Sequence, residues 1–356
     1  MNARILGVLI ILLAVLGGGA LLVRQQTASQ PPADTVKLGQ PLLKDLQAAA
    51  VAAIVIRQPK GSLTIAKQGE RWTIAERDGF PADFDKVRDF VIKAISLKVG
   101  QSETLSEQDR TRLNLDGSGT AVEFLGADAK LLARIALGRK YFKVQPDNPD
   151  QAKGDGRYVA LPDDPQRALV VADPLAQASA LSADWVSKSA IAADKVKSLE
   201  VRHAGGGVWK IERSADNADW KLAGAQASEK LDVSKANIAA YTFTKLELAD
   251  VAPKGTKAED SGLAEPTVVT ATTLDGVTYA VKVGKIEGEN YYATIAVAGE
   301  PKPEGKDAAE RLKAIRERLP REQALAGYTL LIPKFKLEDV LKKRAELLAA
   351  KEPAKK

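Results

Sequence analysis

An internal duplication constrains the fold of this chain more than any other feature of its sequence. Three segments of the first half recur in the same order in the second half. The matching pairs are 51–56 with 196–201, 61–67 with 207–213, and 72–75 with 220–223. The third pair begins with Trp72 and Trp220, which lie 148 positions apart. Because self-similarity at a fixed spacing marks repeated structural units, we expect the same unit to occur twice.

Each copy continues with a helix and a group of strands. Apolar residues recur near helical spacing over residues 83–95 and 233–243. Apolar and β-branched runs predict further strands at 120–125, 131–137 and 157–161, and at 267–272, 278–283 and 291–295. Asp275-Gly276 indicates a tight hairpin turn. Strands grouped on either side of a helix, rather than alternating with helices, favour an α+β fold of two related, mostly antiparallel units.

These patterns divide the chain into six segments. They are a membrane anchor at 1–24, a linker at 25–44, a first α+β unit at 45–163, a helical connector at 164–186, a second α+β unit at 187–300, and a basic helix–strand–helix segment at 301–356. In the last segment we expect helices at 307–319 and 337–348, with a strand at 328–332. The two units can form separate domains or two halves of one continuous sheet, and the pattern leaves both open.

The uncharged run from Ile5 to Val23 predicts a single transmembrane helix. At 1.5 Å per residue it spans about 28 Å, close to the ~30 Å hydrocarbon core of a bilayer. Arg4 and Arg24 bracket the run. A signal peptide cleaved near Thr27 is the rival, but the length of the run favours a retained anchor. The body then lies in the bacterial periplasm, attached to the inner membrane.

Composition excludes several classes of site. The chain has no cysteine and one histidine, so Cys nucleophiles, disulfides, Cys-ligated zinc, iron–sulfur clusters and multi-His metal centres are ruled out. The net charge is +6, and its surplus lies from Glu310 onward. A DNA-binding domain carries basic residues on a face with groove-reading elements, so we expect no nucleic-acid partner. A solvated or membrane-proximal basic tail is the favoured interpretation.

The residues that invite a functional reading also have structural ones. His203 has no accompanying nucleophile motif, and we expect a surface histidine beside a turn. The glycines 205–207 lack the spacing of a phosphate loop and predict a turn between strands. Trp72 and Trp220 occupy equivalent positions, which indicates core packing rather than a carbohydrate platform.

Acidic clusters supply oxygen ligands for calcium in principle, but none has the spacing of an EF-hand loop. Asp83, near Asp85, is expected at a helix N-terminus, and the cluster of Asp147, Asp150 and Asp155 in a polar loop. We therefore expect no catalytic, cofactor-binding or metal-binding residues, and no cofactor.

An ordered series of short motifs resembles the DUF4340 family. The motifs are Phe80-Pro-Ala-Asp-Phe-Asp-Lys-Val, Leu113-Asn-Leu, Leu137-Gly, Arg157-Tyr-Val and Asp184-Trp-Val, and the resemblance covers most of residues 45–345. The second copy departs from the pattern, with residues 227–232 in place of Pro-Ala-Asp, so a role of that turn is not assumed to be duplicated.

The resemblance implies a membrane-anchored bacterial envelope protein, often a companion of gliding-motility-type ABC transporter components, and it supplies no catalytic residues. We therefore expect a non-enzymatic accessory subunit that contacts the permease or ATPase subunits of such a transporter. The basic helix at 337–348 is expected to offer a further contact, to an acidic protein face or anionic lipid. The alternative is a periplasmic carboxylate-dependent hydrolase or glycan-binding envelope protein.

Overall fold

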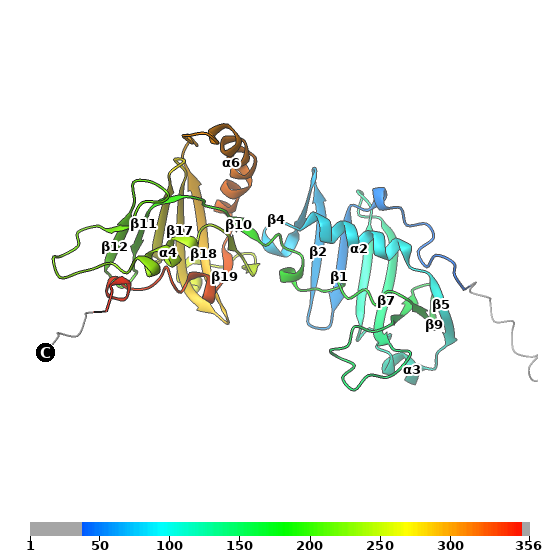
Figure 1. Ribbon diagram of the computed structural model, residues 1–356. Helices are drawn as coiled ribbons and strands as arrows, with labels where there is room; N and C mark the ends of the chain where they lie inside the picture. The colour runs from blue at the N-terminus through cyan, green and yellow to red at the C-terminus, as the bar shows by residue number, and fades with distance from the viewer. Residues whose placement is uncertain (1–37, 351–356) are drawn as a thin grey trace, which may run out of the picture.

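A large antiparallel sheet forms the first unit of the computed structural model, which describes residues 38–350 (Figure 1). Its strands are β1 (Ala53–Gln58), β2 (Gly61–Gln68), β3 (Arg71–Ile74), β4 (Phe80–Pro81), β5 (Val99–Thr104), β6 (Thr120–Leu125), β7 (Leu131–Tyr141), β8 (Gly156–Leu161) and β9 (Asp164–Val171). They are arranged in the order β4-β3-β2-β1-β6-β7-β8-β9-β5. Helix α2 (Phe84–Ser96) crosses one face of this sheet, and α3 (Glu107–Arg112) precedes β6.

A separate antiparallel sheet forms the second unit. Its strands are β11 (Val196–Arg202), β12 (Val208–Glu212), β13 (Lys221–Leu222), β15 (Asp250–Val251), β16 (Thr267–Thr273), β17 (Thr278–Glu287), β18 (Asn290–Ala298) and β19 (Leu330–Pro333). They are arranged in the order β13-β12-β11-β16-β17-β18-β19-β15, while β10 (Ser189–Ile191) and β14 (Leu246–Glu247) form a small sheet of their own. Four helices accompany these strands within the described range, namely α4 (Val233–Tyr241), α5 (Ala258–Ser261), α6 (Ala308–Gln323) and α7 (Lys334–Leu337).

The two sheets share one topology, which confirms the α+β fold with two related antiparallel units. The order β3-β2-β1-β6-β7-β8-β9-β5 in the first sheet corresponds, strand by strand, to the complete order of the second. Helices α2 and α4 follow equivalent strands, as do the shorter α3 and α5. Each unit therefore has its own sheet, and the two units are not halves of one continuous sheet.

Equivalent aspartates begin the two main helices. The Asp83 side chain accepts hydrogen bonds from the backbone N–H groups of Asp85 and Lys86, at 3.1 and 3.3 Å. Asp232 caps α4 in the same way. Such caps satisfy backbone donors that lack a partner within the helix. The N-cap predicted for Asp83 is confirmed, and the cap is duplicated although the sequence before it is not.

Two glycines occupy equivalent, tightly packed positions in the two units. A Cβ added at Gly138 in β7 would lie closer than 3.0 Å to the carbonyl oxygen of Leu113, just after α3. At Gly284 in β17 it would meet the carbonyl oxygen of Ser261, at the end of α5, in the same manner. Only glycine allows the backbone to approach so closely in either unit.

Matching lysine contacts show that the second repeat continues to the end of the described chain. Lys86 Nζ donates to the backbone oxygen of Asp184 at 2.7 Å. Lys235 Nζ, at the equivalent place on α4, donates to Glu346 at 2.7 Å. The carbonyls that accept these bonds belong to two short 3-10 turns, η3 (Ser182–Asp184) and η5 (Arg344–Leu347). In each unit, a 3-10 turn thus contacts the first turn of the main helix. The second unit therefore extends well beyond residue 300.

The core of the first unit lies between α2 and the sheet. Phe90 stacks on Phe124 of β6, with ring centroids 6.1 Å apart, and meets the edge of Trp185 at 5.4 Å. All three side chains are fully buried. Leu42 and Leu43 are buried too, so the end of the segment expected as a linker packs on the unit. Trp185, which lies in the expected connector, completes this core.

The helical connector predicted at 164–186 is wrong, because residues 164–171 form β9 and the described helix within the remainder is the short η3. Strand β9 pairs with β8 on one side and β5 on the other, and its Leu169, Val170 and Val171 are buried. Branched side chains pack well on a pleated surface, and this tertiary pairing overrides the local helix preference.

The helix predicted at 337–348 is also wrong. The chain there forms the short α7, turns, and the 3-10 turn η5. Trp209 Nε1 donates to the Lys342 carbonyl at 2.7 Å, which removes an acceptor that a helix needs. Arg344 binds the carbonyl oxygens of Ala223 and Gly224. These contacts with the rest of the second unit hold the segment extended.

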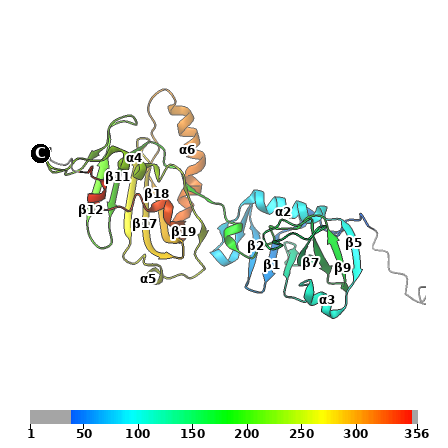
Figure 2. The same ribbon diagram turned by 60° about the horizontal axis from the view of Figure 1, so that its bottom comes forward.

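Each unit carries a long insertion between two strands that its copy lacks. In the first unit, β7 and β8 are joined by the loop at 142–155, whereas β17 and β18 are joined by residues 288–289. In the second unit the β18–β19 connection contains α6, whereas residues 162–163 join β8 and β9. Figure 2 shows α6 beside the second sheet, on the side toward the first unit. Because the shared scaffold needs neither addition, these are the places to look for function.

The predicted anchor, Ile5 to Val23, lies outside the described residues. Among the residues that are described, none of the helices combines the length and apolar character needed to cross a bilayer.

Candidate functional site

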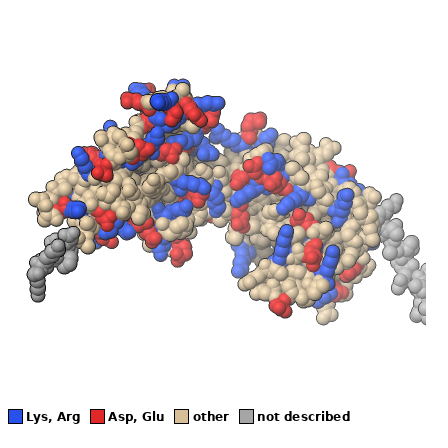
Figure 3. All heavy atoms as spheres, viewed as in Figure 1, with Lys and Arg blue, Asp and Glu red and all other residues tan. Residues whose placement is uncertain are grey.

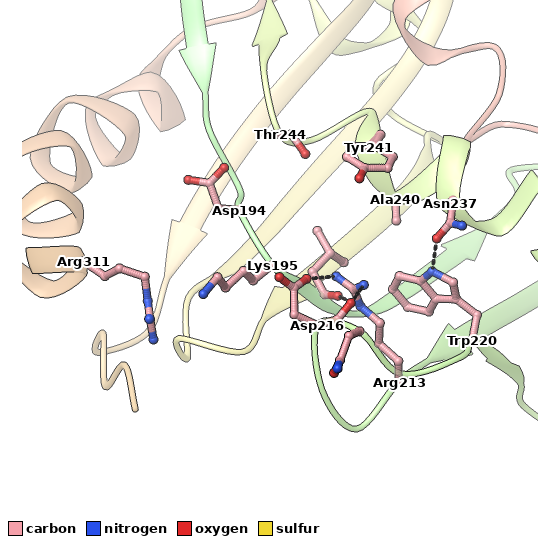
Figure 4. Close-up of a pocket in the computed structure, with 12 residues that line it drawn as sticks. Asp194, Lys195, Arg213, Asp216, Trp220, Asn237, Ala240, Tyr241, Thr244 and Arg311 are labelled. Atoms are coloured by element: carbon pink, nitrogen blue, oxygen red, sulfur yellow. Dashed lines mark hydrogen bonds and ion pairs between the residues drawn. The ribbon is translucent and has the colours of Figure 1, made fainter. Parts of the chain in front are cut away.

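A hollow of about 510 Å³ opens on the second unit, between α4 and α6 (Figure 4). Its wall combines apolar surface with charged side chains of both signs. The lining residues are Asp194, Lys195, Val196, Arg213, Asp216, Asn217, Trp220, Asn237, Ala240, Tyr241, Thr244 and Arg311. Arg311 belongs to the helix that the first unit lacks, so this hollow has no duplicate there.

Arg213 and Trp220 form one side of the hollow. The guanidinium carbon of Arg213 lies 4.7 Å from the centroid of the Trp220 ring, and Arg213 Nη2 donates to Asp216 at 2.7 Å. Trp220 Nε1 donates to the side-chain oxygen of Asn237 at 2.9 Å. Trp220 is only 5% exposed, while Trp72 is half-buried against the core. The prediction of core packing is confirmed for Trp220, which is buried and stacked by Arg213, whereas Trp72 is only partly buried against the core.

Two other charged groups of the wall, Arg311 and Asp194, are paired as well. Arg311 binds both carboxylate oxygens of Asp275, at 3.1 and 3.3 Å, and Asp194 lies 3.4 Å from Arg318. Lys195 and Tyr241 are among the groups that remain available to a ligand. Lys195 forms no side-chain bond within the described chain and has a φ of 53°, and Tyr241 is 70% exposed. The hollow therefore offers one ammonium group and one open aromatic ring.

Each carboxyl group of the described chain with a resolved pKa shift has a lowered pKa, so it holds its negative charge near neutral pH. A hydrogen bond from Arg344 holds the pKa of Glu229 at about 2, and one from Ser118 holds that of Asp116 at about 2. A general acid needs a raised pKa, and each of these is lowered. Within residues 38–350, no group of three or more His, Asp or Glu side chains is placed to hold a metal ion. The geometry suits binding by hydrogen bonds and charge.

A second hollow, of about 410 Å³, lies where the two units meet. Tyr328, after α6, donates to the backbone oxygen of Gly79 at 3.4 Å and meets the Phe80 ring edge-on at 4.9 Å. Arg71 from β3 and Arg321 from α6 also line this hollow. Neither arginine forms an ion pair or side-chain hydrogen bond among the described residues. The junction thus presents two uncommitted positive charges over an aromatic floor.

Direct contacts between residues of the two units also hold the junction. Ser182 Oγ donates to the Asp250 carboxylate at 2.7 Å, and Arg77 lies 3.6 Å from the same group. Asp250 belongs to β15 of the second sheet, whereas Arg77 belongs to the first unit. Figure 3 shows charges of both signs gathered over α6, above the junction.

Of the residues singled out in the sequence, Trp220 lines the first hollow, whereas His203, the glycines 205–207 and the acidic cluster line neither of the two hollows. His203 is half-buried rather than a surface residue, and its Nε2 is enclosed without a hydrogen-bond partner. The glycines 205–207 form the predicted turn between β11 and β12. Asp147, Asp150 and Asp155 lie in the predicted polar loop, which joins β7 and β8.

Sequence reasoning missed Arg71 and Arg321. An arginine on an exposed strand end or helix face resembles any other in the sequence. The signal that could have found Arg321 is the failure of the repeat itself, since α6 interrupts a hairpin that the first copy closes tightly. Arg71 carries no such signal.

Comparison with known proteins identifies the family. The sequence matches a domain of unknown function, DUF4340, over residues 72–266, which is more than half of the 356-residue chain. No curated protein and no solved structure matches it. The matched segment begins in β3 of the first unit and ends just before β16 of the second. The chain belongs to the DUF4340 family.

Proposed function

We propose that this chain is a non-enzymatic periplasmic protein, anchored in the bacterial inner membrane through Ile5 to Val23. It acts as an accessory subunit of a gliding-motility-type ABC transporter complex. The apolar run and the family resemblance support the anchor and the partner. A single span offers no transport path of its own, so its part in transport is to bind subunits that have one.

The observation that carries this proposal is the junction hollow. Arg71 and Arg321 come from different units and have no counter-charge within the described chain. Arginine is enriched at protein interfaces because its planar guanidinium binds carboxylates with two hydrogen bonds. Phe80 and Tyr328 provide the aromatic floor that such contacts use as an anchor. We infer that the partner surface is an acidic periplasmic loop of the permease, because such a loop would have the complementary charge.

Affinity purification tests the proposal. The full-length protein is recovered from gently solubilised membranes, and its partners are identified by mass spectrometry. We expect permease and ATPase subunits with the wild type, and a several-fold loss with the double variant Arg71→Gln/Arg321→Gln. The matched control is Arg316→Gln, an exposed arginine on the same helix that does not line the hollow. Reproducible recovery without any transporter subunit would refute the transporter role.

The anchor is tested separately. Alkaline phosphatase fused after residue 60 should be active, because the enzyme folds in the periplasm, and the protein should resist extraction from membranes by salt. A soluble chain that begins near residue 30 would instead show a cleaved signal peptide.

Glycan binding is the second candidate function, and the exposed ring of Tyr241 favours it. An aromatic face beside Lys195 and Asn217 matches the amphipathic character of a sugar. Under this candidate, Tyr241→Ala abolishes retention on purified peptidoglycan while transporter subunits still co-purify. Tyr292→Ala, at a partly buried tyrosine of β18 that does not line this hollow, serves as the control. A carboxylate-dependent hydrolase has no comparable support in the pKa values.

A further inference from the structure

The fold shared by the two units does not require the long loop at 142–155. The second unit closes the equivalent hairpin with residues 288–289 and forms the same sheet. Long loops in compact units usually carry function. Lys140 holds this loop by two hydrogen bonds, which its Nζ donates to the carbonyl oxygens of Asp150 and Ala152 at 2.7 and 2.8 Å. The loop is therefore held in place rather than loosely attached.

The fastened loop forms one wall of a hollow of about 410 Å³ on the first unit. The opposite walls come from the end of α3 and from β7 and β8. Four basic side chains line it, together with Asn114, Gln145 and the rings of Phe142 and Tyr158. The basic residues are Arg112, Arg139, Lys140 and Arg157. Asp150 is the one acidic residue of the lining.

Three of these four positive charges have no carboxylate partner in the described part of the chain. Arg157 donates to the backbone oxygens of Gly138 and Pro174, at 2.9 and 3.0 Å. Lys140 likewise binds only carbonyl groups, and Arg139 makes no side-chain bond. Carbonyl groups satisfy the donors without cancelling their charge. Arg112 alone is paired, with Asp109 at 3.0 Å.

Such a concentration of charge is costly unless an anion compensates it. Desolvation disfavours charged groups, and burial lowers the pKa of the Arg157 guanidinium accordingly. Arginine forks match the oxygens of a phosphate group, and several cations together favour a ligand with more than one negative charge. A volume of about 410 Å³ lies in the range of small-molecule pockets.

We propose that this cleft of the first unit binds a small ligand bearing a phosphate group. Arg139 and Arg157 contact the phosphate, while Phe142, Tyr158 and Gln145 line the space for its organic part. The phosphate belongs either to a soluble compound or to a lipid headgroup. The site lies apart from the junction hollow and does not depend on the transporter role.

Isothermal titration of the full-length protein in a mild detergent tests this proposal. The probes are glucose 6-phosphate, inorganic phosphate and glucose, and a second arm uses nanodiscs with and without phosphatidic acid. We expect glucose 6-phosphate to bind and glucose not to bind. Arg139→Gln should weaken binding about tenfold, the equivalent of one charged hydrogen bond. Arg139 is exposed and its backbone N–H bond to Leu113 is retained, so the variant should fold.

The control variant is Arg316→Gln, which leaves the cleft untouched. Binding to phosphatidic acid nanodiscs alone, lost in Arg139→Gln, would support the cleft and assign the phosphate to a lipid headgroup. Binding that is equal in Arg139→Gln and wild type would overturn the proposal. So would the absence of binding to every phosphate-bearing probe.

Discussion

Replacing Gly138 with alanine tests the duplicated interior. The added methyl group would lie closer than 3.0 Å to the carbonyl oxygen of Leu113, a separation that real Cβ atoms do not show. It would also touch the side chain of Leu115. The backbone after α3 must therefore move away from β7, because a carbonyl group in a tight turn cannot rotate aside as a flexible side chain can.

Two costs set the magnitude. Overpacking a well-packed interior costs about 1–3 kcal/mol. The movement also breaks the bond from Arg139 N to the Leu113 carbonyl oxygen, which measures 2.9 Å, at about 0.5–1.5 kcal/mol. We therefore expect Gly138→Ala to lower the free energy of unfolding by about 2–4 kcal/mol. Gly284→Ala should have an effect of similar size, because the Ser261 carbonyl oxygen occupies the equivalent place.

Denaturant titration followed by circular dichroism measures these changes. The matched control is Gly205→Ala, where a new Cβ meets nothing within 4 Å and φ is not positive. That variant should be neutral or stabilised by up to about 1 kcal/mol, because alanine restricts the unfolded chain. If the free energies of unfolding of Gly138→Ala and Gly205→Ala differ by less than about 0.5 kcal/mol, the close approach of α3 to β7 is refuted.

Further predictions concern the second unit. Glu322→Ala should lower the free energy of unfolding by about 3–5 kcal/mol, because the buried carboxylate accepts hydrogen bonds from Tyr279 OH at 3.0 Å and from the Ala192 N–H at 2.9 Å. The control is Glu317→Ala, at an exposed position of the same helix, which should change that free energy by no more than about 0.5 kcal/mol in the same titration. Trp220→Ala should cost about 3–5 kcal/mol, and a loss under about 1 would contradict its place in the core. Glu229 has a folded pKa of about 2, below its usual value, so its contribution is complete above the unfolded pKa and declines as the pH falls toward 2. The difference in denaturation midpoint between wild type and Glu229→Gln should shrink over that window, and a constant difference would contradict the ion pair with Arg344.

The duplication made much of the fold predictable. Helices α2 and α4 and the strands β6, β7, β16 and β17 lie where residue patterns placed them, because each buries one face and repeats in both copies. Two independent copies of a weak pattern support each other. The edge strands β5 and β15 were missed, since β5 is exposed over most of its length and β15 contains only two residues.

Predictions failed where long-range contacts determine the local structure. Residues 164–171 form a strand only because β5 and β8 lie on either side. Residues 337–348 leave the helix because Trp209 and Lys235 bind their carbonyl groups from far along the chain. Neither partner can be recognised from local periodicity.

The basic C-terminal contact expected from the sequence is affected by the same finding. Arg344 binds Glu229 at 2.7 Å and two backbone carbonyl groups of the second unit. Lys342 binds Asp339 at 2.5 Å. These side chains hold the chain's own fold, so the amphipathic basic helix envisaged for an acidic partner or lipid is not formed. Arginines without a carboxylate partner in the described chain lie instead at the junction and in the cleft of the first unit.

Site-specific photo-crosslinking in intact cells tests the docking proposal most directly. A photoreactive amino acid is placed at position 71, at position 321, or at the control position 202, an exposed residue of β11 that does not line the junction hollow. We predict crosslinks to a permease subunit from 71 and 321 and none from 202. Crosslinks from 202 alone, or none to any transporter subunit from the two junction positions, would contradict the account.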